Sequence, residues 1–510
     1  MQADRITRGQ VAALFLILAA AALPFADLSL AGHDPWDALR RMAMGFLAPD
    51  FAAVENIGRT LWLTLMFAIA GVAAGGIGGL ILAPFYDHRG VRALCIALRS
   101  VHELFWALML MQVLGIGAGT GVLAIALPYA GIFAKVFAEQ LDEIDQRPSR
   151  MLAPGTDALS RFLYARAPLA RQAMSSYTLY RLECALRSSA VLGFIGLPTL
   201  GFQLDSFFRQ GDYGAASAVM VIYVALIASI RLWMRWRLAP LWVLAAVVSL
   251  ATLKSPPMGG GAIWRFLTTD IVPAPLRTGD WAGFADWLGR LLTTEMLPGI
   301  AATLICAQIA LALTGMLAFL SFGVIVARVA GRVGAAAGHL VLVILRSFPE
   351  YMLAYLFLQI LGPSMLPAVL ALALHNGAII AHLVGRQAGA MTGQLRADAP
   401  RGATLWGYEL APRLFGPFLA LCLYRWEIIV RETAVMGLLG IATLGFFIDS
   451  AVAELRLDRA MVLLVAAGLL TAAIDSISRL VRRRIGPAGS RALPHEARLR
   501  SGGPSYTTAW

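Results

Sequence analysis

Uninterrupted apolar runs of about twenty residues recur along this chain, and that length lets a helix cross a lipid bilayer. Clear examples, taken with their flanks, are Val11–Leu30, Leu61–Ala83, Gly119–Ala138, Ala215–Ile230 and Met461–Ile474. The hydrocarbon core offers backbone N–H and C=O groups no water, so we expect these runs to be helices. The chain is 59% hydrophobic and only 14% charged, which excludes an ordinary water-soluble domain. The sequence predicts an all-α integral membrane protein.

The net charge of +12 does not indicate a nucleic-acid partner, because no soluble domain is visible to carry a basic surface. Lys135 and Lys254 are the only lysines, and most of the arginines fall between apolar runs. Two clusters stand out, at Arg231, Arg235 and Arg237 and at Arg479, Arg482, Arg483 and Arg484. This placement is typical of cytoplasmic loop ends in a multi-pass membrane protein.

The chain contains an internal duplication. At an offset of 244, the segment 180–196 meets 424–440, with Tyr, Arg, Glu, Arg, Ala, Val and two Gly residues identical. At an offset of 247, Leu98-Arg-Ser-Val-His-Glu meets Leu345-Arg-Ser-Phe-Pro-Glu, and 122–127 meets 369–374. Two blocks in the same order, with an offset that changes slightly between them, indicate two tandem copies of one unit.

Each copy contains about six expected spans. In the first copy they lie near 11–30, 60–83, 97–115, 119–139, 183–203 and 214–231. In the second they lie near 239–253, 299–327, 339–362, 366–386, 427–448 and 459–478. An even number returns the chain to its starting side, so we expect about twelve spans in two parallel six-helix repeats, with both termini cytoplasmic. Glycines and polar residues in 183–203 and 427–448 weaken the boundaries of these two spans and suggest that one of them is a broken or re-entrant helix.

These patterns set the expected domain boundaries. Residues 1–237 form the first repeat, 238–486 the second, and 487–510 a disordered cytoplasmic tail. Two long, basic, proline-containing loops, 140–178 and 389–423, are expected on the cytoplasmic side, and loops of such length are usually functional. A glycine cluster at 71–79 lies inside a span, where it favours close helix packing over phosphate binding.

Motifs for enzymatic chemistry are missing from the sequence. Neither lysine stands in a Gly-Lys-Ser/Thr segment, so the chain lacks a nucleotide-binding P-loop. His102-Glu103 lacks the second histidine of a metalloprotease motif, and His375 and His382 are explained as polar residues in a helix bundle. We therefore predict no catalytic residues, no metal site, no cofactor and no ATPase activity in this chain.

Four charge pairs, each with a spacing of four residues, are repeated between the copies. They are Arg99 with Glu103, Arg346 with Glu350, Glu183 with Arg187, and Glu427 with Arg431. This spacing places two side chains on one helix face, where opposite charges neutralise each other. Charges inside a membrane are costly and face a partner or a cavity. Two interpretations stay open: ion pairs that fix helix packing, or arginines that line or gate a path for an anion.

Four segments carry a resemblance to a known family. They resemble the permease subunits of phosphonate ABC importers and are 176–196 around Tyr180-Arg-Leu-Glu, the pair Arg99-Ser-Val-His-Glu and Arg346-Ser-Phe-Pro-Glu, and Gly131-Ile-Phe-Ala-Lys-Val-Phe-Ala-Glu. The resemblance covers roughly residues 50–235 and 290–485. It implies a type I importer permease fold, normally a homodimer, with both halves fused here in one chain.

The resemblance also implies partners. Such permeases dock on two copies of an ATP-binding subunit and receive substrate from a periplasmic binding protein. The cytoplasmic loops would then contain the helices that couple the permease to the ATPases. Gly155 and Pro168 keep the family's spacing of thirteen residues, whereas Ala399 stands where the second loop should have its glycine, before Pro412. Further candidate coupling residues are Tyr164, Tyr408 and Glu409.

The function implied is import of phosphonate, phosphite or phosphate by alternating access, driven by ATP that a separate subunit hydrolyses. A secondary transporter of two parallel six-helix halves, driven by an ion gradient, is the main alternative. It leaves the repeated cytoplasmic loop unexplained. A lipid-modifying membrane enzyme would need a catalytic cluster that the sequence does not show, and a scaffold without transport is a weaker third alternative.

Overall fold

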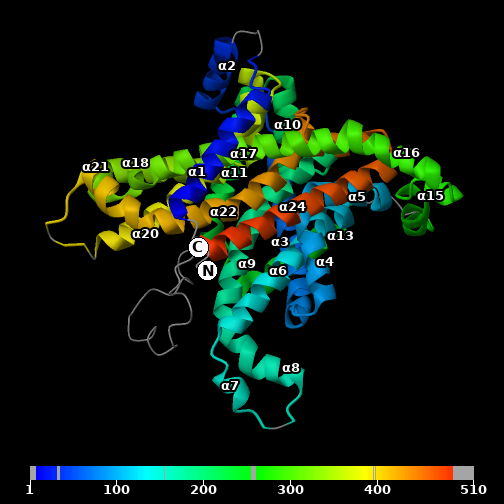
Figure 1. Ribbon diagram of the computed structural model, residues 1–510, viewed down its shortest axis with the longest axis horizontal. Helices are drawn as coiled ribbons and strands as arrows, with labels where there is room; N and C mark the ends of the chain where they lie inside the picture. The colour runs from blue at the N-terminus through cyan, green and yellow to red at the C-terminus, as the bar shows by residue number, and fades with distance from the viewer. Residues whose placement is uncertain are drawn as a thin grey trace, which may run out of the picture. The chain divides into compact units, whose positions relative to one another are not determined.

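The computed structural model of the chain describes residues 7–30, 35–153, 155–253, 260–393, 395–396 and 398–485. Every regular element in these ranges is a helix (Figure 1). Seven helices are long and apolar enough to cross a membrane, or up to ten spans if each of three bent helix pairs is counted as one. The all-helical membrane fold is therefore confirmed, while the count of spans stays below the expected twelve. The expected tail, 487–510, lies outside the described residues.

The described residues form two compact units. The first comprises residues 41–267, and we call it the early unit. The second comprises residues up to Arg40 together with those from Thr268 onward, and we call it the late unit.

The early unit is built on a bundle of long helices joined by short ones. After the C-terminal part of α2 (Pro35–Leu47), its elements are α3 Ile57–Leu82, η2 Ala83–Phe85, α4 Arg89–Ser100, α5 Glu103–Leu114, α6 Ala118–Glu143, α7 Arg147–Arg150, α8 Ala158–Arg161, η3 Phe162–Arg166, α9 Ala167–Val191, η4 Leu192–Ile195, α10 Leu200–Gln210, α11 Tyr213–Ala228, α12 Ile230–Trp233, η5 Trp236–Leu238, α13 Ala239–Ala251 and α14 Ala262–Arg265.

The late unit repeats much of this order. It begins with α1 Arg8–Ala22 and η1 Leu23–Phe25, which precede the early unit in the sequence. After the early unit, η6 (Phe266–Asp270) leads into the remaining elements, which are α15 Ala274–Thr278, α16 Trp281–Leu291, η7 Leu292–Met296, α17 Leu297–Ser321, η8 Phe322–Ile325, α18 Ala327–Ser347, α19 Glu350–Leu361, α20 Met365–Thr392, α21 Gly402–Thr404, η9 Leu405–Leu410, α22 Ala411–Met436, η10 Gly437–Leu439, α23 Leu444–Ala453 and α24 Leu457–Ile485.

The first helix of each sequence repeat packs in the unit that the other repeat mainly forms. Thus α1 belongs to the late unit and α13 to the early unit. Helix α1 contacts α17, where the Gln308 side chain donates a hydrogen bond of 2.9 Å to the Phe15 carbonyl. Helix α13 contacts α3, where the Trp62 indole N–H bonds to Ser249 Oγ at 2.9 Å. The compact units therefore exchange their first helices relative to the sequence halves.

Small residues allow α3 and α6 to pack closely. A Cβ added to Gly71 would lie 2.7 Å from the Ile125 side chain, and one added to Gly75 would lie 2.8 Å from Cβ of Tyr129. These glycines are four residues apart, so they face the same neighbour. The expected packing role of the 71–79 glycine cluster is confirmed at these positions, because any larger side chain would push the two helices apart.

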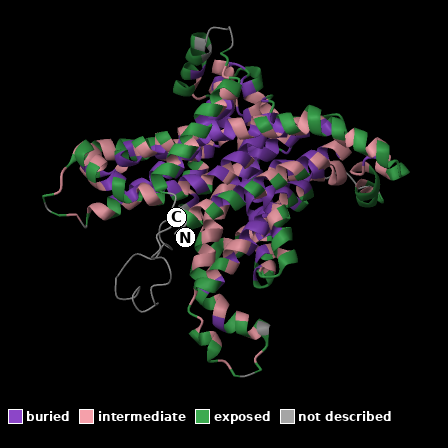
Figure 2. Cartoon of the chain, in the orientation of Figure 1, coloured by how far each residue is buried: buried purple, intermediate pink, exposed green. Residues whose placement is uncertain are grey.

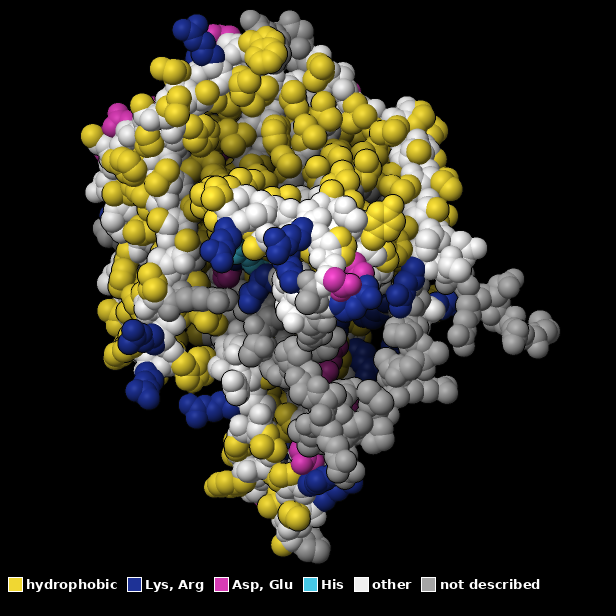
Figure 3. All heavy atoms as spheres, turned by 90° about the vertical axis from the view of Figure 1, so that its left-hand side faces the viewer, with side chains coloured by type: hydrophobic (Ala, Val, Ile, Leu, Met, Phe, Trp, Pro, Cys, Tyr) yellow, Lys and Arg dark blue, Asp and Glu magenta, His cyan; other side chains and the backbone are white. Residues whose placement is uncertain are grey.

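Burial separates helices that face other helices from helices that face the surroundings (Figure 2). In the most apolar window of α20, 83% of the residues are buried, whereas the figure is 11% for α1 and for α18. An apolar helix that leaves its side chains exposed is suited to contact with lipid. In Figure 3, hydrophobic side chains cover much of the face in view, and Lys and Arg side chains gather together below them.

Two expectations about the elements need correction. The span near 97–115 is not one helix, because α4 and α5 meet at an angle of 93°. The long loops 140–178 and 389–423 are also shorter than expected, since α9 already begins at Ala167 and α22 at Ala411. In both cases a proline stands in the first turn of the new helix, where its missing N–H is harmless. The polar, basic sequence after it is helical.

A break is expected in one of the segments 183–203 and 427–448, and the structure has one in both. The helix ending in η4 and the following α10 are bent by 55°, and the helix ending in η10 and the following α23 by 46°. Each bend has a glycine with positive φ, Gly196 at 86° and Gly440 at 82°. Only glycine adopts this conformation without strain, so the two copies break this helix by the same device.

Candidate translocation site

Arg99 and Glu103, whose spacing is repeated in the second copy, lie on either side of a helix break in the early unit. Arg99 lies in the last turn of α4, and Glu103 is the first residue of α5. His102 caps α5, since its ring Nδ1 accepts a hydrogen bond of 3.2 Å from the Leu104 N–H. The expectation that Arg99 and Glu103 share one helix face is therefore wrong. The α4–α5 break puts them on different helices, with Glu103 at the start of α5, where a carboxylate is favoured.

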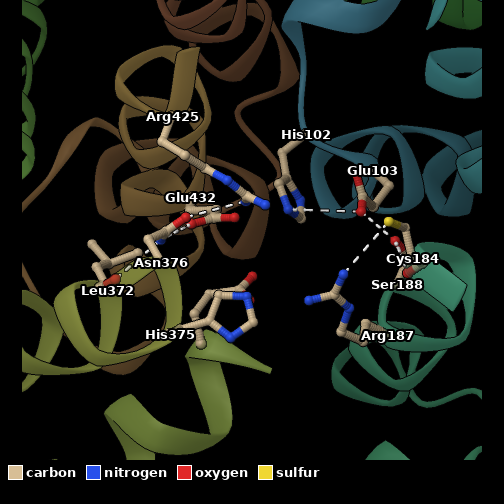
Figure 4. Close-up of polar contacts among 11 residues, drawn as sticks. His102, Glu103, Cys184, Arg187, Ser188, Leu372, His375, Asn376, Arg425 and Glu432 are labelled. Carbon is tan, nitrogen blue, oxygen red and sulfur yellow. Dashed lines mark hydrogen bonds and ion pairs between the residues drawn. The ribbon is translucent and has the colours of Figure 1, made fainter. Parts of the chain in front are cut away.

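Glu103 meets a hydroxyl from another helix. Ser188 of α9, which is 5% exposed, donates a short hydrogen bond to the Glu103 carboxylate. The His102 ring lies beside the same carboxylate, with Nε2 3.8 Å from Oε1 (Figure 4). Neither His102 nor Ser188 was among the candidate site residues. The early unit therefore holds a carboxylate, 14% exposed, between a buried imidazole and a buried hydroxyl.

Glu183 and Arg187 lie on α9, as their spacing predicted. The Arg187 guanidinium reaches the Cys184 sulfur at 3.5 Å. Two turns earlier, Arg181 lies over the rings of three tyrosines, with centroid distances of 5.3 to 5.7 Å for Tyr129, Tyr177 and Tyr180. Aromatic faces attract a cation most strongly when it is desolvated. A set of rings is thus one way in which this unit accommodates a buried arginine.

The late unit has the same break with different chemistry. Arg346 lies in the last turn of α18, and Glu350 begins α19 after Pro349. These two residues therefore do not share a helix either. The Glu350 carboxylate lies 3.7 Å from Nε2 of His375, whose side chain is 1% exposed. Glu350 is the residue that aligns with Glu103, so both copies present a carboxylate to a buried imidazole at this break.

A second polar group lies beside this one in the late unit. The Asn376 amide donates a hydrogen bond of 2.9 Å to the carboxylate of Glu432, and its oxygen accepts one of 3.2 Å from Arg425 (Figure 4). Asn376 is fully buried and Glu432 is 8% exposed. Charged groups buried this deeply between apolar helices are rare and usually mark a path for polar substrate. Glu427 and Arg431, the last predicted pair, lie one helical turn apart on α22.

The sequence contained a signal for these additional residues. Glu432 aligns with Ser188, and His375-Asn376 aligns with Pro128-Tyr129. The candidate pairs were chosen because the copies agree at them. The partners His375, Asn376 and Arg425 become visible only where the copies disagree, or where helices distant in the sequence come together.

The candidate coupling residues lie in matched elements. Tyr164 lies in η3 and Tyr408 in η9, both π-helical turns, and their side chains are 79% and 83% exposed. Pro168 and Pro412 follow in the first turns of α9 and α22. Two large aromatic side chains exposed at equivalent positions form a pair of protruding contacts suited to a partner.

The rest of the coupling segments differ between the copies. Gly155 has a φ of 93°. In the second copy the positive φ belongs to Gly402, at 65°, rather than to a residue at Ala399. Glu409 forms a short ion pair with Arg413, whereas Arg166 of the first copy pairs with Asp142 at 3.3 Å. Each segment is thus held by its own ion pair.

In the part of the chain that the structure describes, no group of three or more His, Cys, Asp or Glu side chains is arranged to hold a metal ion. Buried carboxylates, imidazoles and guanidinium groups between apolar helices instead define a multi-pass membrane protein of the transporter class. Comparison with known proteins gives the family.

Over 510 aligned residues the chain is 24% identical to the phosphate-import permease protein PhnE of Mycolicibacterium smegmatis, and the alignment covers 92% of this chain and 93% of that protein. It is 31% identical to the phosphite transport system permease protein PtxC of Stutzerimonas stutzeri over 191 residues, which are 36% of this chain and 70% of that protein. A putative cryptic phosphonate transport system permease of Escherichia coli is 28% identical over 108 residues, 21% of this chain and 88% of that protein.

The chain belongs to the permease family of the ABC import systems for phosphonate, phosphite and phosphate. Proteins of this family are the membrane permeases of those systems and not their ATPases. No family model and no solved structure matches the chain. The family resemblance expected from the sequence is thereby confirmed.

Proposed function

We propose that this permease imports a small phosphorus oxyanion, phosphonate, phosphite or phosphate, by alternating access of two fused repeats. The observation that carries the proposal is the pair of mostly enclosed carboxylates at corresponding helix breaks, Glu103 with Ser188 and Glu350 with His375, whose side chains are 14% and 12% exposed. Charged groups enclosed by membrane helices are costly and usually mark a path for a polar substrate. The relatives' names, which specify phosphate and phosphite, support the substrate class.

The fused repeats would be residues 1–237 and 238–486, each supplying six spans that run in parallel. Support comes from the repeated sequence blocks and from the repeated order of elements, a π-helical turn leading into a long helix that ends at a glycine break. The shorter apolar helices α11 and α13 would count as spans in this arrangement, and α19 would share one span with α18. Both termini would then lie in the cytoplasm, and one chain would replace a permease dimer.

The proposed partners are two copies of an ATP-binding subunit and a periplasmic binding protein. The exposed aromatic pair Tyr164 and Tyr408, on segments followed by Pro168 and Pro412, would enter the ATPase subunits from the cytoplasmic side. Closure of the two ATPases would pull on both segments and rock the repeats against each other. Conformational gating of this kind exposes a central site to one side at a time.

The charge pairs take different roles in this proposal. Glu103, Glu350 and their partners would contact or gate the passing anion, since a carboxylate repels an anion and an imidazole or guanidinium attracts it. Arg99, Arg346, Glu183, Arg187, Glu427 and Arg431 would provide the balancing charges along the path.

The test is coupled ATP hydrolysis. The full chain, purified together with its proposed ATP-binding subunit, should hydrolyse ATP several-fold faster when binding protein loaded with phosphonate, phosphite or phosphate is added. Stimulation by none of these oxyanions would overturn the substrate class. Uptake into vesicles that contain this chain alone, driven by an ion gradient without ATP, would instead favour a secondary transporter.

A further inference from the structure

Two histidines meet between α18 and α20 of the late unit, apart from the carboxylate groups described above. The rings of His339 and His382 have centroids 5.1 Å apart, inclined by 40°. His382 is only 5% exposed, and among the described residues neither of its ring nitrogens has a hydrogen-bond partner. A buried imidazole with both nitrogens unsatisfied loses its bonds to water and gains none in return. Such a ring needs an explanation.

The charged groups that act on His382 in the described part of the chain are all basic. They are Arg346, His339 and Arg386. Arg386 follows His382 by one helical turn on α20, and Arg346 follows His339 by two turns on α18, so each pair occupies one face of its helix. His375 precedes His382 by two turns on the same face of α20. Basic side chains thus follow this face from the buried Glu350–His375 pair to the exposed Arg386.

The other copy shows what a neutralised version of this cluster looks like. At the offset of 247, His339, His382 and Arg386 align with Arg92, Lys135 and Glu139. In the early unit Lys135 lies 4.0 Å from Glu139, and Arg92 lies 3.5 Å from Asp87. There the basic groups have acidic neighbours within their own helices or the adjoining turn. The late unit has Arg386 at the position that aligns with Glu139, so the charge at this position is opposite in the two copies.

We propose that His339, Arg346, His382 and Arg386 form a binding site for a tetrahedral, phosphate-type oxyanion in the late unit. A guanidinium group binds such an anion through two parallel N–H bonds, and an imidazole N–H adds a further donor. The anion would satisfy the His382 ring and offset the mutual repulsion of the basic groups.

Under the proposed function, on which the identity of the ligand rests, this site receives the imported oxyanion after it passes the Glu350–His375 pair. The same phosphate chemistry is also found in lipid headgroups, which could reach the exposed His339 and Arg386. The two sources are distinguished by experiment.

The first experiment measures equilibrium binding of radiolabelled inorganic phosphate to the purified full chain in a phosphate-free maltoside detergent, without ATPase or binding protein. Saturable binding is expected in the wild type. Arg386→Glu, which restores the charge found at Glu139, and His382→Leu should each weaken it at least tenfold. His382→Gln should retain most of the affinity, because its amide supplies a donor of similar reach. The melting temperature of each variant shows whether it is folded.

Two matched controls should leave phosphate affinity unchanged. Lys135→Leu removes the residue that aligns with His382 in the other copy. Arg290→Glu changes the charge of an exposed arginine on α16 of the same unit. Equal weakening by Lys135→Leu, or folded Arg386→Glu and His382→Leu variants that bind phosphate as the wild type does, would overturn the site.

The second experiment repeats the titration with a short-chain phosphatidylglycerol. Displacement of bound phosphate by the lipid, or lipid binding alone that Arg386→Glu abolishes, assigns the site to a headgroup. Binding of phosphate that the lipid does not displace assigns it to the free anion. Binding of neither probe overturns the proposal. These results do not depend on transport: phosphate binding persists here even if the coupled ATPase test fails, and intact transport without binding rejects only this site.

Discussion

The two units bury different polar groups at positions that the duplication makes equivalent. In the early unit Ser188 donates a hydrogen bond to Glu103. The late unit has Glu432 in place of that serine, and it also has Asn376 in place of Tyr129 to donate to the new carboxylate. Arg425 aligns with Arg181. Arg181 lies over tyrosine rings, whereas Arg425 donates a hydrogen bond to the Asn376 oxygen.

The residues that differ between the copies are coupled in each unit, because the residue at position 188 or 432 contacts a different partner in each. A buried carboxylate without a partner costs several kcal/mol, and Glu432 has such a partner in the Asn376 amide. The early unit therefore keeps small and aromatic partners, and the late unit a connected set of amide, carboxylate and guanidinium groups.

The largest expected effect comes from placing the late unit's carboxylate in the early unit alone. Ser188→Glu buries a second carboxylate beside Glu103 with no amide at Tyr129 to receive it. We expect a loss of about 3–5 kcal/mol of stability, the usual cost of an uncompensated buried charge. Thermal unfolding followed by fluorescence size-exclusion chromatography measures it. Ser176→Glu, at an exposed position of the same helix, should change little, and a Ser188→Glu protein as stable as this control would contradict the coupling.

A somewhat smaller effect is expected when the amide of the late unit is changed. Asn376→Asp replaces the donor to Glu432 with a second carboxylate, and we expect a loss of about 1–3 kcal/mol. Adding Glu432→Gln should recover most of it, because the new amide donates to the new carboxylate. The coupling energy comes from the double-mutant cycle of melting temperatures. Simple addition of the two single effects would show that the pair does not interact.

The coupling segments test whether the units differ outside the membrane as well. Tyr164→Ala and Tyr408→Ala each remove an exposed aromatic side chain, so the melting temperature should not change. If both tyrosines enter ATPase subunits, each variant should lower stimulated ATP hydrolysis about tenfold, as expected for an aromatic contact of 1–2 kcal/mol. A loss in only one variant would mean that one copy dominates docking. Full activity in both would remove these tyrosines from the interface.

The smallest effect concerns pH. Hydrogen bonds from the Ser29 hydroxyl and N–H hold the pKa of Asp27 below its ordinary value. A lowered pKa contributes stability above the ordinary aspartate value, and this contribution is lost as pH falls through the folded value. Ser29→Ala should therefore slightly reduce the melting temperature at neutral pH and leave it unchanged at strongly acidic pH. A difference between variant and wild type that grows on acidification would contradict this sign.

Much of the fold could be predicted because long apolar runs in the sequence indicate membrane helices. The apolar runs, the duplication and the glycine breaks near Gly196 and Gly440 all rest on local chemistry. The 93° bend between α4 and α5 is not predicted, because no proline or glycine marks the turn in Arg99-Ser-Val-His-Glu and this polar segment is flanked by apolar residues on both sides. Because of that bend, the prediction that Arg99 and Glu103 share one helix face is wrong.

The site was only partly predictable for a related reason. Repetition identified Glu103 and Glu350, but their partners Ser188 and His375 come from other helices. No periodicity within one segment indicates which residue of a distant helix will face a given carboxylate. The disagreement between copies at Ser188 and Glu432 was the available signal, and its meaning depended on Asn376 lying close by.

The exchange of first helices has a consequence for the time course of synthesis. The hydrogen bond between Gln308 and Phe15 joins residues 293 positions apart. At a translation rate of about 5–20 residues per second, α1 leaves the ribosome roughly 15–60 seconds before its partner helix exists. During that interval α1 cannot contact α17, and its apolar, largely exposed surface suits it to contact with lipid. Maturation of this protein should therefore be limited by how late its first helix is captured.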